Sequence, residues 1–222
     1  MKKQYEEICK RIDQACVSAD RAFQDVTLVA VSKKQSVERI KKAYDLGIRN
    51  FGENYVQELL VKKEQLPKDI RWHFIGDTQS RKIPKIAGTV YMVHSLDRES
   101  QLEKWVSIEK EKRPLLLLQV NLSKEETKSG VMPDEVEAFL QKILQTDLVL
   151  NGLMVFPPNA KDAQENRAFF SQAKALQTRI QMLQHPRLPC VALSQGVSND
   201  FEVAIEEGAT HVRLGTILFG ER

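Results

Sequence analysis

The sequence lacks an apolar run of about 18 residues, the length that a membrane-spanning helix needs. Residues 1–20 contain lysines but no apolar stretch, so they resemble neither a secretory signal nor a transit peptide. The sequence also lacks a large excess of charge of one sign, because it has 33 Lys and Arg and 30 Asp and Glu. We therefore expect a cytoplasmic protein with no membrane or nucleic-acid partner.

Cysteine is scarce, with three residues at positions 9, 16 and 190 and no CxxC pair. This spacing excludes a disulfide framework and a cysteine zinc site. The four histidines, at positions 73, 94, 185 and 211, form no HExxH or HxH motif, so we expect no metal. With 42% hydrophobic and 28% charged residues, the composition is that of a folded globular chain.

What the sequence does contain is a regular alternation of strand-like and helix-like segments. A helix over residues 6–17 comes first, and eight apolar strand-like segments follow, separated by amphipathic stretches. Ser36 is expected to begin one of the helices, and Asn54 to cap the next with Gln57 three residues later. The expected strands are Val26–Val31, Ile48–Glu53, Arg71–Gly76, Thr89–Ser95, Pro114–Asn121, Leu148–Phe156, Pro189–Ser194 and His211–Gly215.

Eight such units, at about 27 residues each, predict a single (β/α)8 TIM-type barrel. An open doubly wound sheet is the alternative, but the segment after the first strand, Ser32–Ser36, has no glycine for its phosphate loop. No linker or repeat divides residues 1–222, so we expect one domain and no second domain. Because the sequence ends soon after the eighth strand, the extra N-terminal helix is expected to take the place of the closing helix.

The polar residues that follow these strands are the candidates for function, because barrel sites lie at the carboxyl ends of the strands. Lys33 directly follows an apolar strand, where burial lowers the pKa of a lysine and favours a Schiff-base role. The alternative is that Lys33 only extends into solvent.

Two neighbouring loops near the end of the chain favour a phosphate site. One contains Ser194 and Ser198 ahead of a helix, and the other contains Gly215 and Thr216. Alternatively, Ser198 is only a helix cap and Gly215 only a turn residue. A phosphate beside a strand-end lysine suggests either pyridoxal 5′-phosphate or a sugar phosphate bound by a Schiff-base aldolase.

Arg213 bears on that choice, because it lies two residues before Gly215 and points into the barrel. A guanidinium has five donors and no acceptor. Facing a pyridine nitrogen it can only donate a hydrogen bond, so that nitrogen stays unprotonated.

Eight short blocks, in order, resemble the YggS/PROSC family of pyridoxal phosphate homeostasis proteins. The resemblance extends from about residue 28 to residue 220. The blocks are AVSK (30–33), FGENYVQE (51–58), WHFIG (72–76), HSLDR (94–98), VNLSKEETKSGV (120–131), GLM (152–154), LSQGVSNDFEVAI (193–205) and VRLGTILFG (212–220).

The resemblance implies a barrel like the N-terminal domain of alanine racemase, with pyridoxal 5′-phosphate bound as a covalent aldimine on Lys33. It also implies that Arg213 faces the pyridine nitrogen and that Asn54 and Met154 lie near the ring. The phosphate would be held by Ser194, Ser198, Gly215 and Thr216.

The sequence departs from the family pattern at the rim of the expected site rather than at these positions. None of the departures removes an implied cofactor contact, but they alter any partner surface or entry channel found in relatives. They are Lys34, Gln35, Thr78, Arg81, Gln195 and Val197.

We therefore expect a monomeric protein that buffers or supplies pyridoxal 5′-phosphate, with apo enzymes that use this cofactor as partners. No catalytic residue is expected, because Arg213 weakens the ring as an electron sink and no residues remain for the racemase β-domain that carries a second base. The alternatives are a small amino-acid racemase with Lys33 as base and, third, a Schiff-base aldolase.

Overall fold

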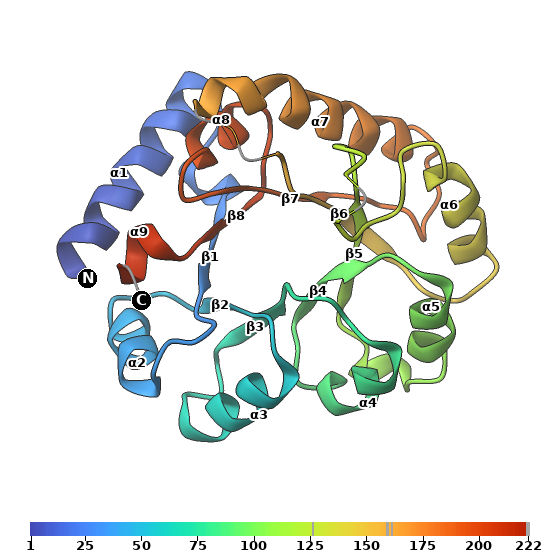
Figure 1. Cartoon of the computed structure of the whole chain (residues 1–222), viewed down its shortest axis with the longest axis horizontal. Coiled ribbons are helices and arrows are strands. Elements are labelled where there is room, and N and C mark those ends of the chain that lie inside the picture. Colours follow the sequence, from blue (N-terminus) through green and yellow to red (C-terminus); the bar gives the residue numbers. More distant parts are fainter. Residues whose placement is uncertain (126, 159, 161, 221–222) are drawn as a thin grey trace.

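The computed structural model describes residues 1–125, 127–158, 160 and 162–220. Eight parallel strands form a closed barrel in chain order, and β8 pairs with β1 to complete it (Figure 1). The predicted barrel is therefore confirmed. The strands are β1 (Thr27–Val31), β2 (Asn50–Glu53), β3 (Arg71–Phe74), β4 (Met92–Leu96), β5 (Leu115–Val120), β6 (Leu150–Val155), β7 (Ala192–Val197) and β8 (His211–Leu214).

Helices surround the barrel, and none in the described part of the chain is long and apolar enough to cross a membrane. They are α1 (Lys2–Ser18), α2 (Val37–Asp45), α3 (Val56–Gln65), α4 (Ile83–Ile86), α5 (Glu99–Val106), α6 (Val136–Leu144), α7 (Arg167–Gln181), α8 (Phe201–Glu206) and α9 (Thr216–Phe219). Single turns of 3-10 helix lie at Phe23–Asp25, Ser80–Lys82, Lys110–Lys112 and Ala163–Asn166.

The N-terminal helix α1 covers the part of the barrel where the short helices α8 and α9 leave room. It packs against both of them. Arg11 of α1 pairs with Glu202 of α8, and its guanidinium lies 4.7 Å from the centre of the Phe201 ring. The extra helix therefore occupies the expected place beside the closing strand.

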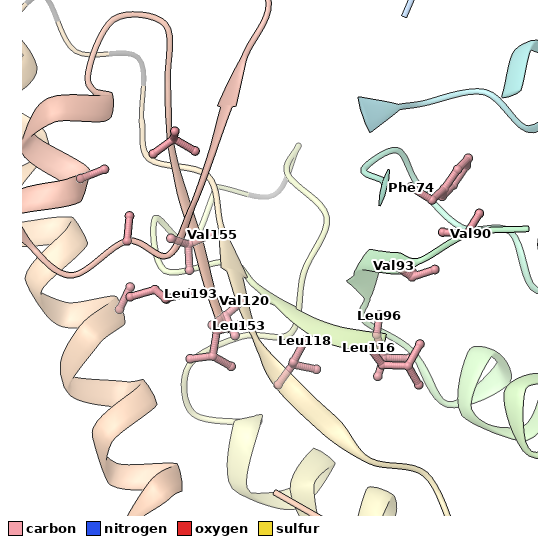
Figure 2. Packing of buried hydrophobic residues seen from close by; sticks show 14 of the residues in the cluster. Phe74, Val90, Val93, Leu96, Leu116, Leu118, Val120, Leu153, Val155 and Leu193 are labelled. Atoms are coloured by element: carbon pink, nitrogen blue, oxygen red, sulfur yellow. The ribbon is translucent and has the colours of Figure 1, made fainter. Parts of the chain in front are cut away.

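Successive side chains along each strand point to opposite faces, so an outer apolar layer is separated from the barrel interior. In β5, Leu116, Leu118 and Val120 belong to the large cluster between strands and helices, part of which Figure 2 shows. Leu117, between them in sequence, belongs instead to a small interior cluster. That cluster consists of Met92, Leu117, Met154 and Ala192, with Leu115 packed against it.

Two local predictions are corrected by the structure. Asn54 does not cap α3, because Tyr55 occupies the N-cap position and no side chain caps the helix. Strand β7 begins and ends three residues later than expected, which places Ser194 inside the strand rather than in the loop after it. The predicted cap Ser36 is confirmed, since its hydroxyl accepts a hydrogen bond from Arg39 N.

Candidate functional site

The carboxyl ends of β1, β2, β7 and β8 meet at one rim of the barrel, because all eight strands are parallel. Lys33 is half-buried two residues beyond the end of β1. The pairing of β1 with β8 sets Val29 opposite Arg213, so Arg213 lies on the strand next to the one that Lys33 follows. The structure thus places the predicted lysine and the predicted arginine in the same sector of the rim.

Arg213 is enclosed in the barrel, with 2% of its surface exposed. Its guanidinium donates to Ser194 Oγ at 2.7 Å and to the carbonyl oxygen of Val155 at 3.0 Å. The ring of Phe156 lies 4.3 Å from Cζ. Burial lowers the pKa of Arg213 from 12.5 to about 10. Its Nε atom is buried without a hydrogen-bond partner among the described residues.

No carboxylate of the described residues forms an ion pair with Arg213, and its hydrogen-bond partners are neutral, although the charge of Asp200 favours the charged guanidinium. Such a charge is unfavourable in a folded protein unless a partner compensates it. The guanidinium therefore has both a spare donor and a buried charge without an ion-pair partner among the described residues to offer to an acceptor.

A chain of hydrogen bonds continues from Arg213 through the barrel interior. Ser194 Oγ lies 2.9 Å from His94 Nδ1, and His94 Nε2 lies 2.9 Å from His73 Nδ1. His73 Nε2 lies 3.0 Å from Asn50 Oδ1, which can only accept. His73 must then donate to Asn50, and His94 to His73. The Ser194 hydroxyl in turn donates to His94, which leaves its oxygen to accept from Arg213.

This order of donors requires both histidines to be neutral, and burial favours that state. Burial, followed by the charges of neighbouring groups, holds the pKa values of His73 and His94 well below 6.5. Burial also lowers the pKa of His211, a third interior histidine, to about 4. Neutral rings do not compete with Arg213 for negative charge, so Arg213 is the cation that an anionic ligand meets inside the barrel.

The histidine chain was missed in the sequence, where the histidines were considered only as metal ligands. Alternation offered a signal: His73 and Arg71 share one face of β3, as His211 and Arg213 share one face of β8. Among the described residues, no cluster of three or more His, Cys, Asp or Glu could hold a metal ion.

Asn54 and Met154, both expected near a ring, lie in different surroundings. Asn54 Oδ1 is buried and has no partner among the described residues. The chain passes so close here that a Cβ on Gly76 would lie 2.3 Å from the Asn54 carbonyl oxygen. Met154 is fully buried, and the strand register sets it beside Ser194, the partner of Arg213.

The structure brings together some, but not all, of the residues predicted to bind a phosphate. The Thr216 hydroxyl donates to Ser198 Oγ at 3.2 Å, so the loops after β7 and β8 are in contact. Ser198 is not the cap of α8, since Asp200 holds that position. Ser194 stands apart from this pair, because it lies within β7 and bonds Arg213.

Gly215 lies between Arg213 and Thr216, and packing within the chain does not account for it. A Cβ there would meet Val31 only at 3.5 Å, which is ordinary contact. Gly196 is different: its φ is +86° and a Cβ would lie 2.5 Å from that of Ala204. The LSQGVS block thus needs its glycine for the fold, whereas a Cβ at Gly215 would make only ordinary contacts within the chain.

Two cavities flank Phe156, the aromatic residue that lies against Arg213. One of about 200 Å³ is lined in part by Pro157, Val197 and Asp200. The other, of about 300 Å³, includes Gln119 and Asn121. The mouth of the barrel is therefore hollow on the side of β5, β6 and β7.

Comparison with known proteins identifies the family of this chain. Residues 10–222 match the model of the family "alanine racemase, N-terminal domain". The pyridoxal phosphate homeostasis protein of Aquifex aeolicus is 39% identical over 224 residues, which cover 97% of this chain and 95% of that protein. The protein of the same name from Synechocystis is 40% identical over 202 residues, covering 89% and 92%.

Solved structures show the same fold. PipY of Synechococcus elongatus without pyridoxal phosphate is 38% identical with a TM-score of 0.81, covering 88% of this chain and 93% of PipY. With pyridoxal phosphate bound, PipY is 36% identical with a TM-score of 0.80, covering 94% and 100%. Alanine racemase of Corynebacterium glutamicum has a TM-score of 0.67 at 14% identity and shares the fold, over 96% of this chain and 60% of the racemase.

Proposed function

This chain belongs to the family of the alanine racemase N-terminal domain, and from that premise we propose that it binds pyridoxal 5′-phosphate and acts in the homeostasis of this cofactor. Its relatives in Aquifex and Synechocystis are named for that role, and the similarity covers nearly the whole length of both proteins. PipY, of the same fold at 36% identity, has been solved with the cofactor bound.

The observation that carries the proposal is the buried Arg213 with its unpartnered Nε and no ion-paired carboxylate among the described residues. The cofactor has an acceptor nitrogen in its ring and a negatively charged phosphate, and both suit this donor. Asn54 Oδ1 is a second buried polar atom without a partner at the same rim. The residues present therefore fit the cofactor.

Each residue then has a distinct task. Lys33 supplies the amine that attaches the cofactor covalently, and Arg213 donates to the pyridine nitrogen. Ser198 and Thr216 donate their hydroxyls to the phosphate, and Gly215 allows it to approach the backbone. Ser194 acts through Arg213, because its oxygen accepts from the guanidinium. Asn54 and Met154 lie beside the ring.

Pyridoxal 5′-phosphate, when bound, supplies an electrophilic aldehyde and a ring that withdraws electrons. Arg213 opposes that withdrawal, because a donor that stays charged leaves the pyridine nitrogen unprotonated. The hydrogen-bond chain behind Ser194 keeps the guanidinium in place with neutral groups. We therefore favour storage and supply of the cofactor over turnover.

An amino-acid racemase with Lys33 as base is the second candidate, since alanine racemase shares the fold. Steady exchange of the Cα hydrogen of an amino acid would favour it. A sugar-phosphate aldolase is less well supported, because Arg213 suits a pyridine nitrogen. We further propose that the protein acts as a monomer in the cytoplasm and delivers the cofactor to apo enzymes that use it.

Borohydride reduction of the loaded protein, followed by peptide mapping, tests the proposal. We expect a yellow protein whose reduced cofactor lies on Lys33. Lys33→Ala should fold and lose the visible absorption, and Lys34→Ala, one residue away, should keep it. Modification mainly at Lys34 or Lys128 would contradict the assignment, and a colourless protein that takes up no cofactor would contradict the proposed function.

A further inference from the structure

Three charged side chains, two of them buried and the third partly exposed, form a cluster on the outer side of the barrel, between β2 and α3. Glu53 is fully buried and Lys62 is 4% exposed. Lys62 Nζ donates to Glu53 Oε1 at 2.8 Å, to Glu58 Oε1 at 2.5 Å and to the carbonyl oxygen of Ser32 at 2.7 Å. All three hydrogens of the ammonium group are therefore in use.

The same three side chains hold both residues that flank Lys33. Ser32 Oγ donates to Glu53 Oε1 at 2.6 Å, and its carbonyl oxygen accepts from Lys62. On the other side, the backbone N–H of Lys34 donates to Glu58 Oε1 at 2.5 Å. Lys34 has a φ of +61°, a left-handed conformation that a lysine adopts only when its surroundings impose it. The lysine that we assign to the cofactor thus lies between two anchored residues.

The stability of the fold does not explain this cluster. The layer between strands and helices is built mainly of apolar side chains, and a buried ion pair is often no better there than well-packed apolar residues. Glu53 Oε2 has no partner among the described residues, and burial raises the pKa of its carboxyl. A cluster that folding does not require, but that is bonded to both neighbours of Lys33, points to a role at the rim.

We propose that Lys62, Glu53 and Glu58 are positioning residues that fix the backbone from Ser32 to Lys34 and so present the Lys33 amine to the aldehyde of the cofactor. This inference rests on the proposed function. None of the three side chains is assigned a contact with the cofactor, so they act through the backbone on either side of Lys33.

In the step that they serve, Lys33 Nζ forms a bond to the aldehyde carbon of pyridoxal 5′-phosphate. The carbonyl oxygen leaves as water, with both protons of the neutral amine, as the C=N double bond forms. No electron passes to an outside acceptor. The rate of this step depends on the orientation of the amine, and loss of orientation slows such reactions roughly a hundredfold.

The test removes the anchors without leaving a buried charge. In Glu53→Met/Lys62→Met, both buried ions are replaced by apolar side chains, so the protein should fold with a urea midpoint at or above that of the wild type. Glu58→Ala removes the acceptor of the Lys34 N–H, while Glu58→Gln keeps one. Lys63→Met is the matched control on the same helix, since Lys63 bonds Thr89 on the other side.

Two measurements separate positioning from general support of the site. The first is the rate at which pyridoxal 5′-phosphate becomes attached, followed by its absorption. The second is the affinity for pyridoxine 5′-phosphate, an alcohol that has the same ring and phosphate but cannot attach. We expect Glu53→Met/Lys62→Met and Glu58→Ala to attach the cofactor roughly ten- to hundredfold more slowly and to bind pyridoxine 5′-phosphate as the wild type does. Glu58→Gln and Lys63→Met should attach it at the wild-type rate.

An unchanged attachment rate in Glu53→Met/Lys62→Met would overturn the inference. So would a parallel fall in pyridoxine 5′-phosphate affinity, which would mean that the cluster supports the whole site. If the wild type itself attaches no cofactor, the proposed function fails instead. Hydrogen exchange of the ligand-free protein then still tests the positioning role. The Lys34 N–H should exchange faster in Glu58→Ala, which removes its acceptor, and unchanged exchange would contradict the inference.

Discussion

Replacing Arg213 by methionine should stabilise the ligand-free protein and weaken its affinity for pyridoxal 5′-phosphate. Arg213 is buried with only neutral partners, Ser194 Oγ and the Val155 carbonyl oxygen. Methionine fills much of the same space with an unbranched apolar side chain. The substitution therefore removes a buried charge that has no ion-pair partner among the described residues.

The size of the effect follows from the pKa and the two hydrogen bonds. The fall of the Arg213 pKa from 12.5 to about 10 on burial corresponds to about 3 kcal/mol against the folded state at neutral pH. Loss of the hydrogen bond to the Val155 carbonyl oxygen lowers the free energy of unfolding by about 1 kcal/mol. Ser194 keeps its hydrogen bond to His94. We expect a net gain of about 2 kcal/mol in the free energy of unfolding. The lost hydrogen bond to the cofactor should reduce affinity roughly ten- to a hundredfold.

Urea unfolding of the ligand-free protein and a spectroscopic titration with the cofactor measure the two effects. Arg113→Met is the matched control, because that guanidinium donates to two backbone oxygens and to Asp147. It should lower stability and leave affinity unchanged. If Arg213→Met unfolds at lower urea than the wild type, Arg213 is a structural core residue and the reasoning is refuted.

Two further predictions concern the phosphate residues and the interior histidines. Ser198→Ala should weaken cofactor affinity about tenfold, as measured by titration, because one hydroxyl donor to the phosphate is lost; equal affinity of the wild type for pyridoxal and its phosphate ester would exclude this site. Burial lowers the pKa values of His73, His94 and His211, so the unfolded state binds more protons than the folded state below about pH 6.5. Near pH 5.5 each histidine therefore lowers the free energy of unfolding by about 1.4 kcal/mol. His211→Asn should remove one such contribution from the pH dependence of urea unfolding, and identical pH profiles for the variant and wild type would contradict the assignment.

The sequence was sufficient to predict the eight strands, the barrel and the residues at the rim. Alternation of apolar runs is a local property, so β5 and β8 could be located without knowing their neighbours. Lys33, Ser198, Gly215 and Thr216 were found because a parallel barrel brings every strand end to one rim. Boundaries were less certain, and a difference of three residues in β7 moved Ser194 from the loop to the interior.

Only the tertiary structure determined the partners of these residues. His94 and Ser194 are 100 positions apart, and closure of the barrel brings them within 2.9 Å. Asn54 is a favourable cap by residue type, but in the folded chain Tyr55 occupies the N-cap position and Asn54 lies outside the helix. Lys62 reads as a surface lysine in sequence, yet packing of α3 against β2 buries it with Glu53. Local pattern decides which face a residue takes, whereas hydrogen-bond partners depend on distances that the chain sets only when the barrel closes.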